Sequence, residues 1–225
     1  MFSTYLLPAI GWFLFSYLYI SIGEHQIHKR LMHRKPLPAW IYRQYPYVLA
    51  AFEAHAVRHH TKWYREFDYE PDPVGRHENI PIPLKESLLM LVAAFPLWSP
   101  IFWFSTFGGC IFIATAFLHN KLWSVLHRQM HLPGDVFFRE WACYRFVAIN
   151  HFMHHQDTNR HLNVAFPFAD FLFGTRAQPR YADIREMLRL GYIKPRSTLA
   201  KRRIALQQQS IAERRRMLPA GFRTA

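Results

Sequence analysis

The sequence predicts an all-α integral membrane protein, with about three to four membrane helices and a cytoplasmic helical cap that carries groups of histidine. Three observations lead to this prediction: long uncharged apolar runs, an aromatic content of 17%, and 14 histidines among 225 residues. Hydrophobic residues make up 51% of the chain, which excludes a disordered or collagen-like protein. Two cysteines, Cys110 and Cys143, are too few for a disulfide-stapled secreted scaffold or a cysteine-rich zinc module.

The charge distribution divides the chain into two parts. We expect a membrane-embedded domain over residues 1–176 and a basic cytoplasmic tail, helical or disordered, over residues 177–225. The last fifty residues contain 13 Lys and Arg against Asp183, Glu186 and Glu213, and so carry +10 of the formal +13. This excess marks the C-terminal end as cytoplasmic under the positive-inside rule. Anionic lipid accounts for the basic charge, so we expect no nucleic-acid partner.

Two segments before residue 60 have membrane-like composition. Residues 4–22 contain no charged side chain over 19 positions, about the length that crosses a ~30 Å hydrocarbon core. They lack the basic start and the small-residue cleavage site of a signal peptide, so we interpret them as an anchor. Residues 37–54 are apolar and aromatic but include Arg43, Gln44 and Pro46, a composition typical of a helix at the membrane interface.

Residues 84–118 form a second long apolar region. Because Pro96 and Pro100 interrupt it, we expect two helices of roughly 14–18 residues that enter and return, rather than one long helix. Polar connectors that contain proline lie at 61–83 and 132–136. With an interfacial segment at 37–54, this topology places all of the histidine groups on one side of the membrane.

Ten histidines fall into four closely spaced groups. In chain order these are His28 and His33; His55, His59 and His60; His127 and His131; and His151, His154 and His155. Positions i, i+3 and i+4 share one face of an α-helix, so the last two groups, and also His55 with His59, each present imidazoles to one point. Histidine beside membrane segments is costly unless it is paired or coordinates a metal. We therefore predict that all ten are metal ligands, with five nitrogens for each of two metals.

The donor type alone does not choose the metal, because imidazole suits Zn, Cu, Fe and Ni. The spacing does exclude two known arrangements. No glutamate is followed by histidine three positions later, as the soluble di-iron bundles require. The H-E-x-x-H motif of the zinc proteases is also absent from the sequence.

The order of the groups resembles that of the fatty acid hydroxylase superfamily, the membrane-bound histidine-box di-iron oxygenases that include sterol desaturases. The resemblance covers residues 20–176 and is closest to the fatty acid 2-hydroxylase branch. In that branch a glutamate precedes the first histidine pair, as Glu24 does here. After the last group the family carries an Asn, an Asp and then Phe-Gly-Thr, and this sequence has Asn163, Asp170 and residues 173–175 in those places.

The resemblance implies that residues 1–176 are a histidine-box di-iron oxygenase domain. It implies two Fe ions, which Zn can replace in purified protein, and O2. It also implies a separate electron donor, such as a cytochrome b5-like protein, a ferredoxin or a reductase. The implied reaction is hydroxylation of an unactivated C–H bond of a lipid, for example a fatty acyl chain or a sphingolipid. A lipid or sterol desaturase, or a carotenoid hydroxylase of the same superfamily, is the alternative.

The resemblance implies no catalytic residue beyond the metal ligands. We expect hydrogen bonds to the imidazoles, at the ring nitrogens that do not bind metal, to fix their orientation. The residues expected to make them are Glu24, Asp157 and Asn163. The membrane would be the bacterial inner membrane, or the endoplasmic reticulum in a eukaryote, with the histidine groups and the basic end on the cytoplasmic side.

Two other classes of protein stay open from the residues alone. A non-catalytic metal-binding or transport protein would usually place its ligands within the spans, whereas here they begin where the apolar runs stop. A degenerate family member kept as a lipid-binding scaffold would be expected to lack some of the four groups. We interpret the remaining histidines as packing or surface residues rather than ligands: His25, His77, His119 and His161. The aromatic stretch 95–107 is expected to contact the core or lipid rather than line a lipid cavity.

Overall fold

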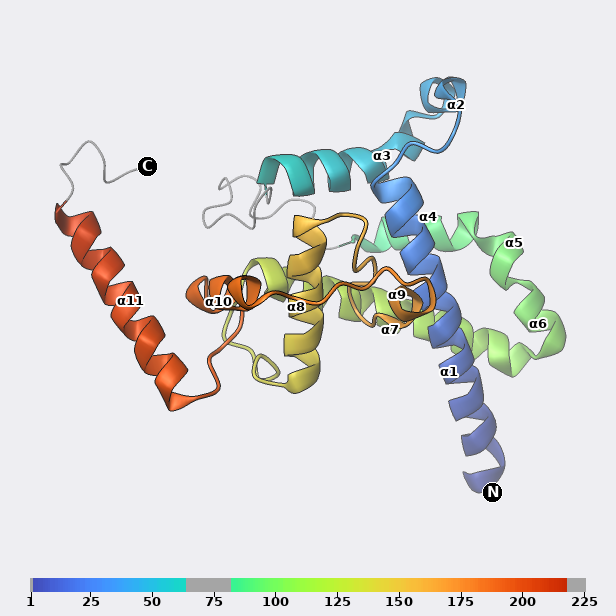
Figure 1. Ribbon diagram of the computed structural model, residues 1–225. Helices are drawn as coiled ribbons and strands as arrows, with labels where there is room; N and C mark the ends of the chain where they lie inside the picture. Colours follow the sequence, from blue (N-terminus) through green and yellow to red (C-terminus); the bar gives the residue numbers. More distant parts are fainter. Residues whose placement is uncertain (1, 64–81, 218–225) are drawn as a thin grey trace.

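The computed structural model describes residues 2–63 and 82–217, and all secondary structure in these residues is helical (Figure 1). Two segments there are long and apolar enough to cross a membrane: Tyr5–Met32 and Thr106–His131. A bent helix pair between them would add a third if it forms one span. The predicted all-α class is confirmed, but the described part of the chain has two to three candidate spans rather than three to four.

The first candidate span is α1 (Phe2–Ile27), which continues into the short π-helical segment η1 (His28–Met32). This helix contains the anchor predicted at 4–22. Only 11% of its most apolar window is buried in the protein. A helix that is apolar on its exposed faces needs lipid around it, so the structure agrees with an anchor in the membrane.

The apolar region that begins at residue 84 is broken at its prolines, as predicted. It forms α4 (Leu84–Ala93), α5 (Phe95–Trp98) and α6 (Pro100–Phe104), with a bend of 62° between α4 and the α5–α6 pair. Pro96 and Pro100 lie in the first turns of α5 and α6, where a missing backbone N–H costs no helical hydrogen bond.

The next helix, α7 (Thr106–His131), begins where the Ser105 hydroxyl accepts a hydrogen bond from the backbone N–H of Gly108 at 3.0 Å. Gly108 also lets α1 approach closely, because a Cβ there would come within 2.5 Å of the Trp12 ring. This helix has 26 residues and is longer than the roughly 14–18 residues predicted for each helix of the apolar region. It continues to residue 131 because several polar side chains beyond 118, such as His119, His127 and Gln129, are buried within the protein rather than facing lipid.

The segment at 37–54, expected as one interfacial helix, is divided into three short pieces. These are α2 (Ala39–Gln44), the 3-10 turn η2 (Pro46–Leu49) and α3 (Ala50–Phe52). Pro46 lacks the N–H that would continue α2, which explains the first break. The chain then enters an eleven-residue π-helical segment, η3 (Glu53–Trp63).

In the C-terminal half, α8 (Ala142–Gln156) packs on α7, the short α9 (Phe168–Leu172) packs on α1, and α10 (Tyr181–Arg189) packs on α8. The main apolar core joins buried residues of α7, α8 and α10, and ends with Tyr192 and Ile193. The last helix, α11 (Thr198–Met217), projects away from this core in Figure 1. Of the two alternatives for the basic tail, the structure therefore has the helical one over this range.

Candidate metal centre

Four elements bring the ten predicted histidines together in the interior. They come from η1 and its end, from η3, from the last two turns of α7, and from α8. We define the first histidine group as His28, His33, His55, His60 and His154, and the second as His59, His127, His131 and His151. His155 forms a third set with His59 and His60. Within each set the potential ligand atoms lie within 4.8 Å of one another, and all ten side chains except that of His33 are buried.

The π-helical turns explain why residues five positions apart meet. In a π-helix the hydrogen bond runs from residue i to residue i+5, so such residues lie one above the other. The backbone N–H of His33 donates to the His28 carbonyl at 3.1 Å in this way, and both imidazoles belong to the first group. His55 and His60, five apart within η3, enter the same group.

This geometry corrects the expectation that neighbouring histidines point to one place. His55 and His59 have ring centroids 5.2 Å apart, yet His55 belongs to the first group and His59 to the second. In α8, His154 similarly belongs to the first group and His151 to the second. The reason is that η3 and α8 each pass between the two groups and supply both. The pair on α7, His127 and His131, does stay together as predicted, with ring centroids 4.7 Å apart.

The nitrogen separations fit metal binding. The Nε2 atom of His55 lies 2.7 Å from that of His28 and 3.1 Å from that of His60. In the second group the Nε2 atoms of His131 and His151 are 2.8 Å apart. Two imidazole nitrogens that each lie about 2.0–2.1 Å from one ion end up about 3 Å apart. The residues present therefore fit a metal ion in each group.

His155 lies between the two groups, and its potential ligand atoms are close to those of His59 and His60. Its ring centroid lies 5.0 Å from His59, 4.7 Å from His131 and 4.8 Å from His151. It is also stacked on His60 of the first group, with centroids 4.0 Å apart. The first group thus has five potential donors and the second has four, with His155 beside both. The division into five nitrogens for each of two ions stays a prediction.

The electrostatics of the centre keep these imidazoles in the form that binds metal. Burial lowers the pKa of His55, His60 and His154 well below the usual range, because the charged form loses its water. Neighbouring imidazoles lower each pKa further, since two positive rings would repel. Neutral imidazole is the form with a lone pair free for a metal, so the centre needs no deprotonation step before it binds one.

Two backbone carbonyls orient imidazoles of the first group. The Nδ1 atom of His28 donates to the Leu162 carbonyl at 2.5 Å, and Nδ1 of His154 donates to the Arg160 carbonyl at 2.8 Å. Each bond leaves Nε2 directed into the group, which is the usual arrangement behind a metal-bound histidine. Neither contact could be predicted from the sequence, because a backbone carbonyl is present at every residue and gives no signal there.

The three residues expected to orient imidazoles make no hydrogen bond or ion pair with the ten histidines in the described structure. The Glu24 carboxylate accepts hydrogen bonds from the Asn163 side-chain amide at 2.9 Å and from the Val164 N–H at 2.8 Å. Asp157 is exposed after α8, where it accepts from the backbone N–H of Asn159. Glu24 and Asn163 therefore act on the imidazoles only indirectly. They fix the segment 162–164, whose first residue supplies the carbonyl to His28.

Asp170 holds the same segment from the other side. Its buried carboxylate accepts hydrogen bonds from the N–H groups of Leu162 and Asn163, at 2.8 and 2.9 Å, and from the Thr175 hydroxyl at 2.6 Å. The Thr175 hydroxyl also lies 3.0 Å from Nε2 of His25. In the sequence, Asp170 stands out only as part of the family pattern, and no role in the site could be predicted for it.

The other histidines lie apart from the two groups, as expected. His25 belongs to the network around Asp170, His161 contacts the backbone of Ala177, and His119 lies 3.5 Å from the Glu24 carboxylate. His77, which we also expected to be no ligand, lies outside the described residues.

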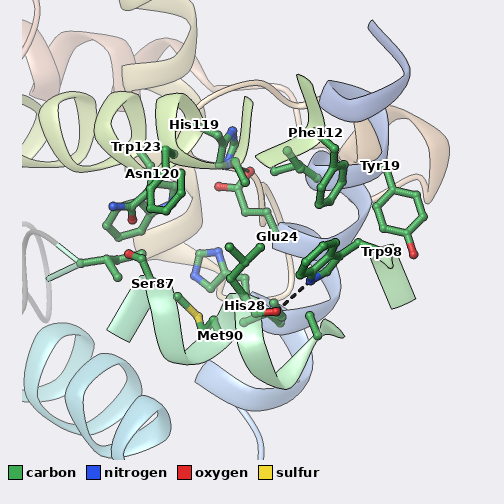
Figure 2. Close-up of a pocket in the computed structure, with 18 of the residues that line it drawn as sticks. Tyr19, Glu24, His28, Ser87, Met90, Trp98, Phe112, His119, Asn120 and Trp123 are labelled. Carbon is green, nitrogen blue, oxygen red and sulfur yellow. Dashed lines mark hydrogen bonds and ion pairs between the residues drawn. The ribbon is translucent and has the colours of Figure 1, made fainter. Parts of the chain in front are cut away.

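A cavity of about 210 Å³ adjoins the first group (Figure 2). It lies between α1, α4, α5 and α7, and most of its wall is apolar. His28 is shared, because its imidazole belongs to the first group and also lines the cavity. Trp98 lines it too, which corrects the expectation that the 95–107 stretch only contacts core or lipid.

The chain thus gathers ten histidines in one interior site next to membrane-length helices. No protein family, curated protein or solved structure matches this chain. The chain is therefore described by its own features. Residues 2–63 and 82–217 are mainly helical and include two to three candidate membrane spans, and their buried histidine groups could hold metal ions.

Proposed function

We propose that this protein is a membrane-bound di-iron oxygenase that hydroxylates an unactivated C–H bond of a lipid. The observation that supports this most directly is the position of His28, which belongs both to a metal-binding group and to the wall of an apolar cavity. A ligand in that cavity would be held by dispersion and the hydrophobic effect, and would present C–H bonds to the first group.

The metal is proposed to be iron because of the chemistry that this position requires. An all-imidazole site suits several metals, and only a redox-active one supplies oxidation of a C–H bond. The order of the histidine groups, which resembles that of the fatty acid hydroxylase superfamily, also favours iron. When bound, two irons with O2 would supply the oxidant. The overall reaction takes O2, two electrons from a separate donor protein and two protons, and gives the alcohol and water.

The protein's own residues would then have three tasks. The two groups hold the ions, and the Leu162 and Arg160 carbonyls fix His28 and His154 in the orientation for binding. The apolar cavity excludes water and places one carbon of the substrate beside the first group. The candidate spans deliver a substrate that is dissolved in the bilayer.

Placement of the ligands favours an enzyme over a transporter. His28 follows the last residue of α1, and His127 and His131 lie in the last turns of α7. The histidine groups thus gather at the ends of both candidate spans, whereas transport sites usually lie near the middle of the membrane. The sequence had indicated ligands wholly beyond the apolar segments, but His28, His127 and His131 lie inside the candidate spans, close to their ends.

We expect a lipid that has gained one oxygen in cells that express the wild-type protein, and none in cells that express His155→Ala. His155 contacts both groups, so its loss disturbs both metals. The measurement is mass spectrometry of total lipids, with iron and a reductant supplied. Gln156→Ala, at an exposed neighbouring position, is the matched control and should give the wild-type profile.

The same experiment separates the alternatives. A product that has lost two hydrogens would make the protein a desaturase, since both reactions begin by removing a hydrogen atom from the chain. Identical lipid profiles for wild type and His155→Ala would contradict an oxygenase, and metal transport would become the function to test.

A further inference from the structure

The cavity beside His28 has two chemically different ends. In Figure 2, Trp98 and Phe112 lie together near Tyr19 at one end, and Asn120 lies with Trp123 at the other, while His28 lies between them. The first end offers only aromatic and aliphatic surface apart from the Tyr19 hydroxyl, which donates to the Leu97 carbonyl. The second end contains the side-chain amide of Asn120, which is half-buried and makes no hydrogen bond with a described residue.

The imidazole of His119 and the carboxylate of Glu24 lie close together in the cavity wall, beside Asn120. The side chain of His119 is only 8% exposed, and its Nε2 atom lies 3.5 Å from the Glu24 carboxylate. Neither ring nitrogen of His119 makes a hydrogen bond within the described residues. Glu24 is held in place by Asn163 and by the Val164 N–H, so its negative charge stays at the cavity wall.

These polar groups limit what the cavity can bind. A buried imidazole without a hydrogen-bond partner is unfavourable, and the half-buried Asn120 amide beside it is open to the cavity. A ligand that hydrogen-bonds to these groups is therefore favoured over a plain hydrocarbon. A carboxylate at the same place would meet the Glu24 charge in a poorly solvated cavity, and would be repelled. The structure therefore favours an uncharged group that both donates and accepts.

We propose that the cavity binds one alkyl chain that ends in an uncharged hydroxyl or amide group. This polar group hydrogen-bonds to Asn120 next to the His119–Glu24 pair, and the chain passes His28 and ends against Trp98 and Phe112. The inference rests on the proposed function, and it names the substrate class: a long-chain alcohol or amide lipid, rather than a free fatty acid.

The test uses the two cavity tryptophans as reporters, because bromine quenches tryptophan fluorescence at short range. The full chain is placed in phosphatidylcholine nanodiscs, free of metal and without turnover. It is titrated with hexadecanol, hexadecanamide and hexadecanoic acid, each brominated at the last carbon, at a pH where the acid is ionised. We expect saturable quenching by the alcohol and the amide at concentrations about tenfold below those needed for the acid.

Substitutions assign the orientation of the chain. Trp98→Phe should abolish the saturable quenching by bromine at the chain end, and Trp123→Phe should leave it. With bromine placed next to the polar group, Trp123→Phe should abolish the saturable quenching and Trp98→Phe should leave it. Equal quenching of both tryptophans by either probe would overturn the proposed orientation.

Asn120→Leu tests the polar contact. We expect it to weaken binding of the alcohol about tenfold, and to leave binding of a brominated alkane of the same length unchanged. Asn159→Leu, the same substitution at an exposed position, should retain wild-type binding. Acid and alcohol that bind equally well, or an alkane that loses as much affinity as the alcohol, would overturn the inference.

The two proposals fail separately in these experiments. Binding is measured without oxidation, so selective binding together with unchanged cell lipids would contradict only the oxygenase. An oxidised lipid in cells together with unselective binding would contradict only the polar contact at Asn120.

Discussion

The His55→Ala variant is expected to lose about one of two bound metal ions per chain, and to lose lipid oxidation by more than a hundredfold. His55 has a central place in the first group, with its Nε2 atom 2.7 Å from that of His28 and 3.1 Å from that of His60. Changes behind a metal ligand typically cost about 10–100-fold in affinity or activity, so loss of a ligand itself should cost at least as much. The measurement is elemental analysis of purified protein, together with the yield of oxidised lipid.

A matched control separates metal binding from folding. His25 is also fully buried, but it contacts Thr175 instead of the histidine groups. His25→Gln keeps a side-chain nitrogen that can reach the Thr175 hydroxyl, and should retain both metals. If His55→Ala binds as much metal as the wild type, the first group is not a metal site. If both variants lose metal and unfold together, the loss reflects stability.

The helices were predictable where composition alone decides them. The anchor at 4–22 lies inside α1, and the prolines at 96 and 100 mark real breaks. The end of α7 was not predictable from hydropathy. Its last turns carry buried polar side chains such as His127 and Gln129. The helix therefore continues beyond the end of its apolar segment.

The histidines themselves were predictable as a set, but their division between two groups was not. α-Helical spacing correctly placed His127 with His131. It failed for His55 and His60, which meet because η3 is π-helical and brings residues five apart into line. A π-turn differs from an α-turn only in which carbonyl each N–H meets, and the local sequence carries no sign of that choice.

The supports behind the metal centre depend on contacts between distant parts of the chain. The Val164 N–H reaches Glu24 across 140 positions, and the Leu162 carbonyl reaches His28 across 134. The sequence indicated that Glu24 and Asn163 matter, but it placed them directly behind imidazoles. Only the folded chain shows that they act through the backbone of 162–164.

Asp170→Ala is expected to lower the free energy of unfolding by about 3–5 kcal/mol. The carboxylate is fully buried and accepts from two backbone N–H groups and the Thr175 hydroxyl. Alanine leaves all three donors without an acceptor, and each buried unsatisfied donor costs about 1–3 kcal/mol. Denaturant titration followed by tryptophan fluorescence measures the change. Asp135→Asn, a carboxylate that is 97% exposed, should shift stability by no more than about 0.5 kcal/mol.

Metal affinity tells whether the Asp170 network serves the site or only the fold. The network fixes Leu162, and the Leu162 carbonyl orients His28, so the first group should bind metal about 10–100-fold more weakly in Asp170→Ala. The metal affinity of Asp170→Asn should be intermediate. Its amide oxygen still accepts a hydrogen bond, but its amide NH2 faces one of the donors and cannot accept from it. A variant that loses stability but keeps wild-type metal affinity would show that the segment 162–164 does not orient His28. Weakened metal binding in Asp170→Asn at nearly native stability would instead make Asp170 a positioning residue for the centre.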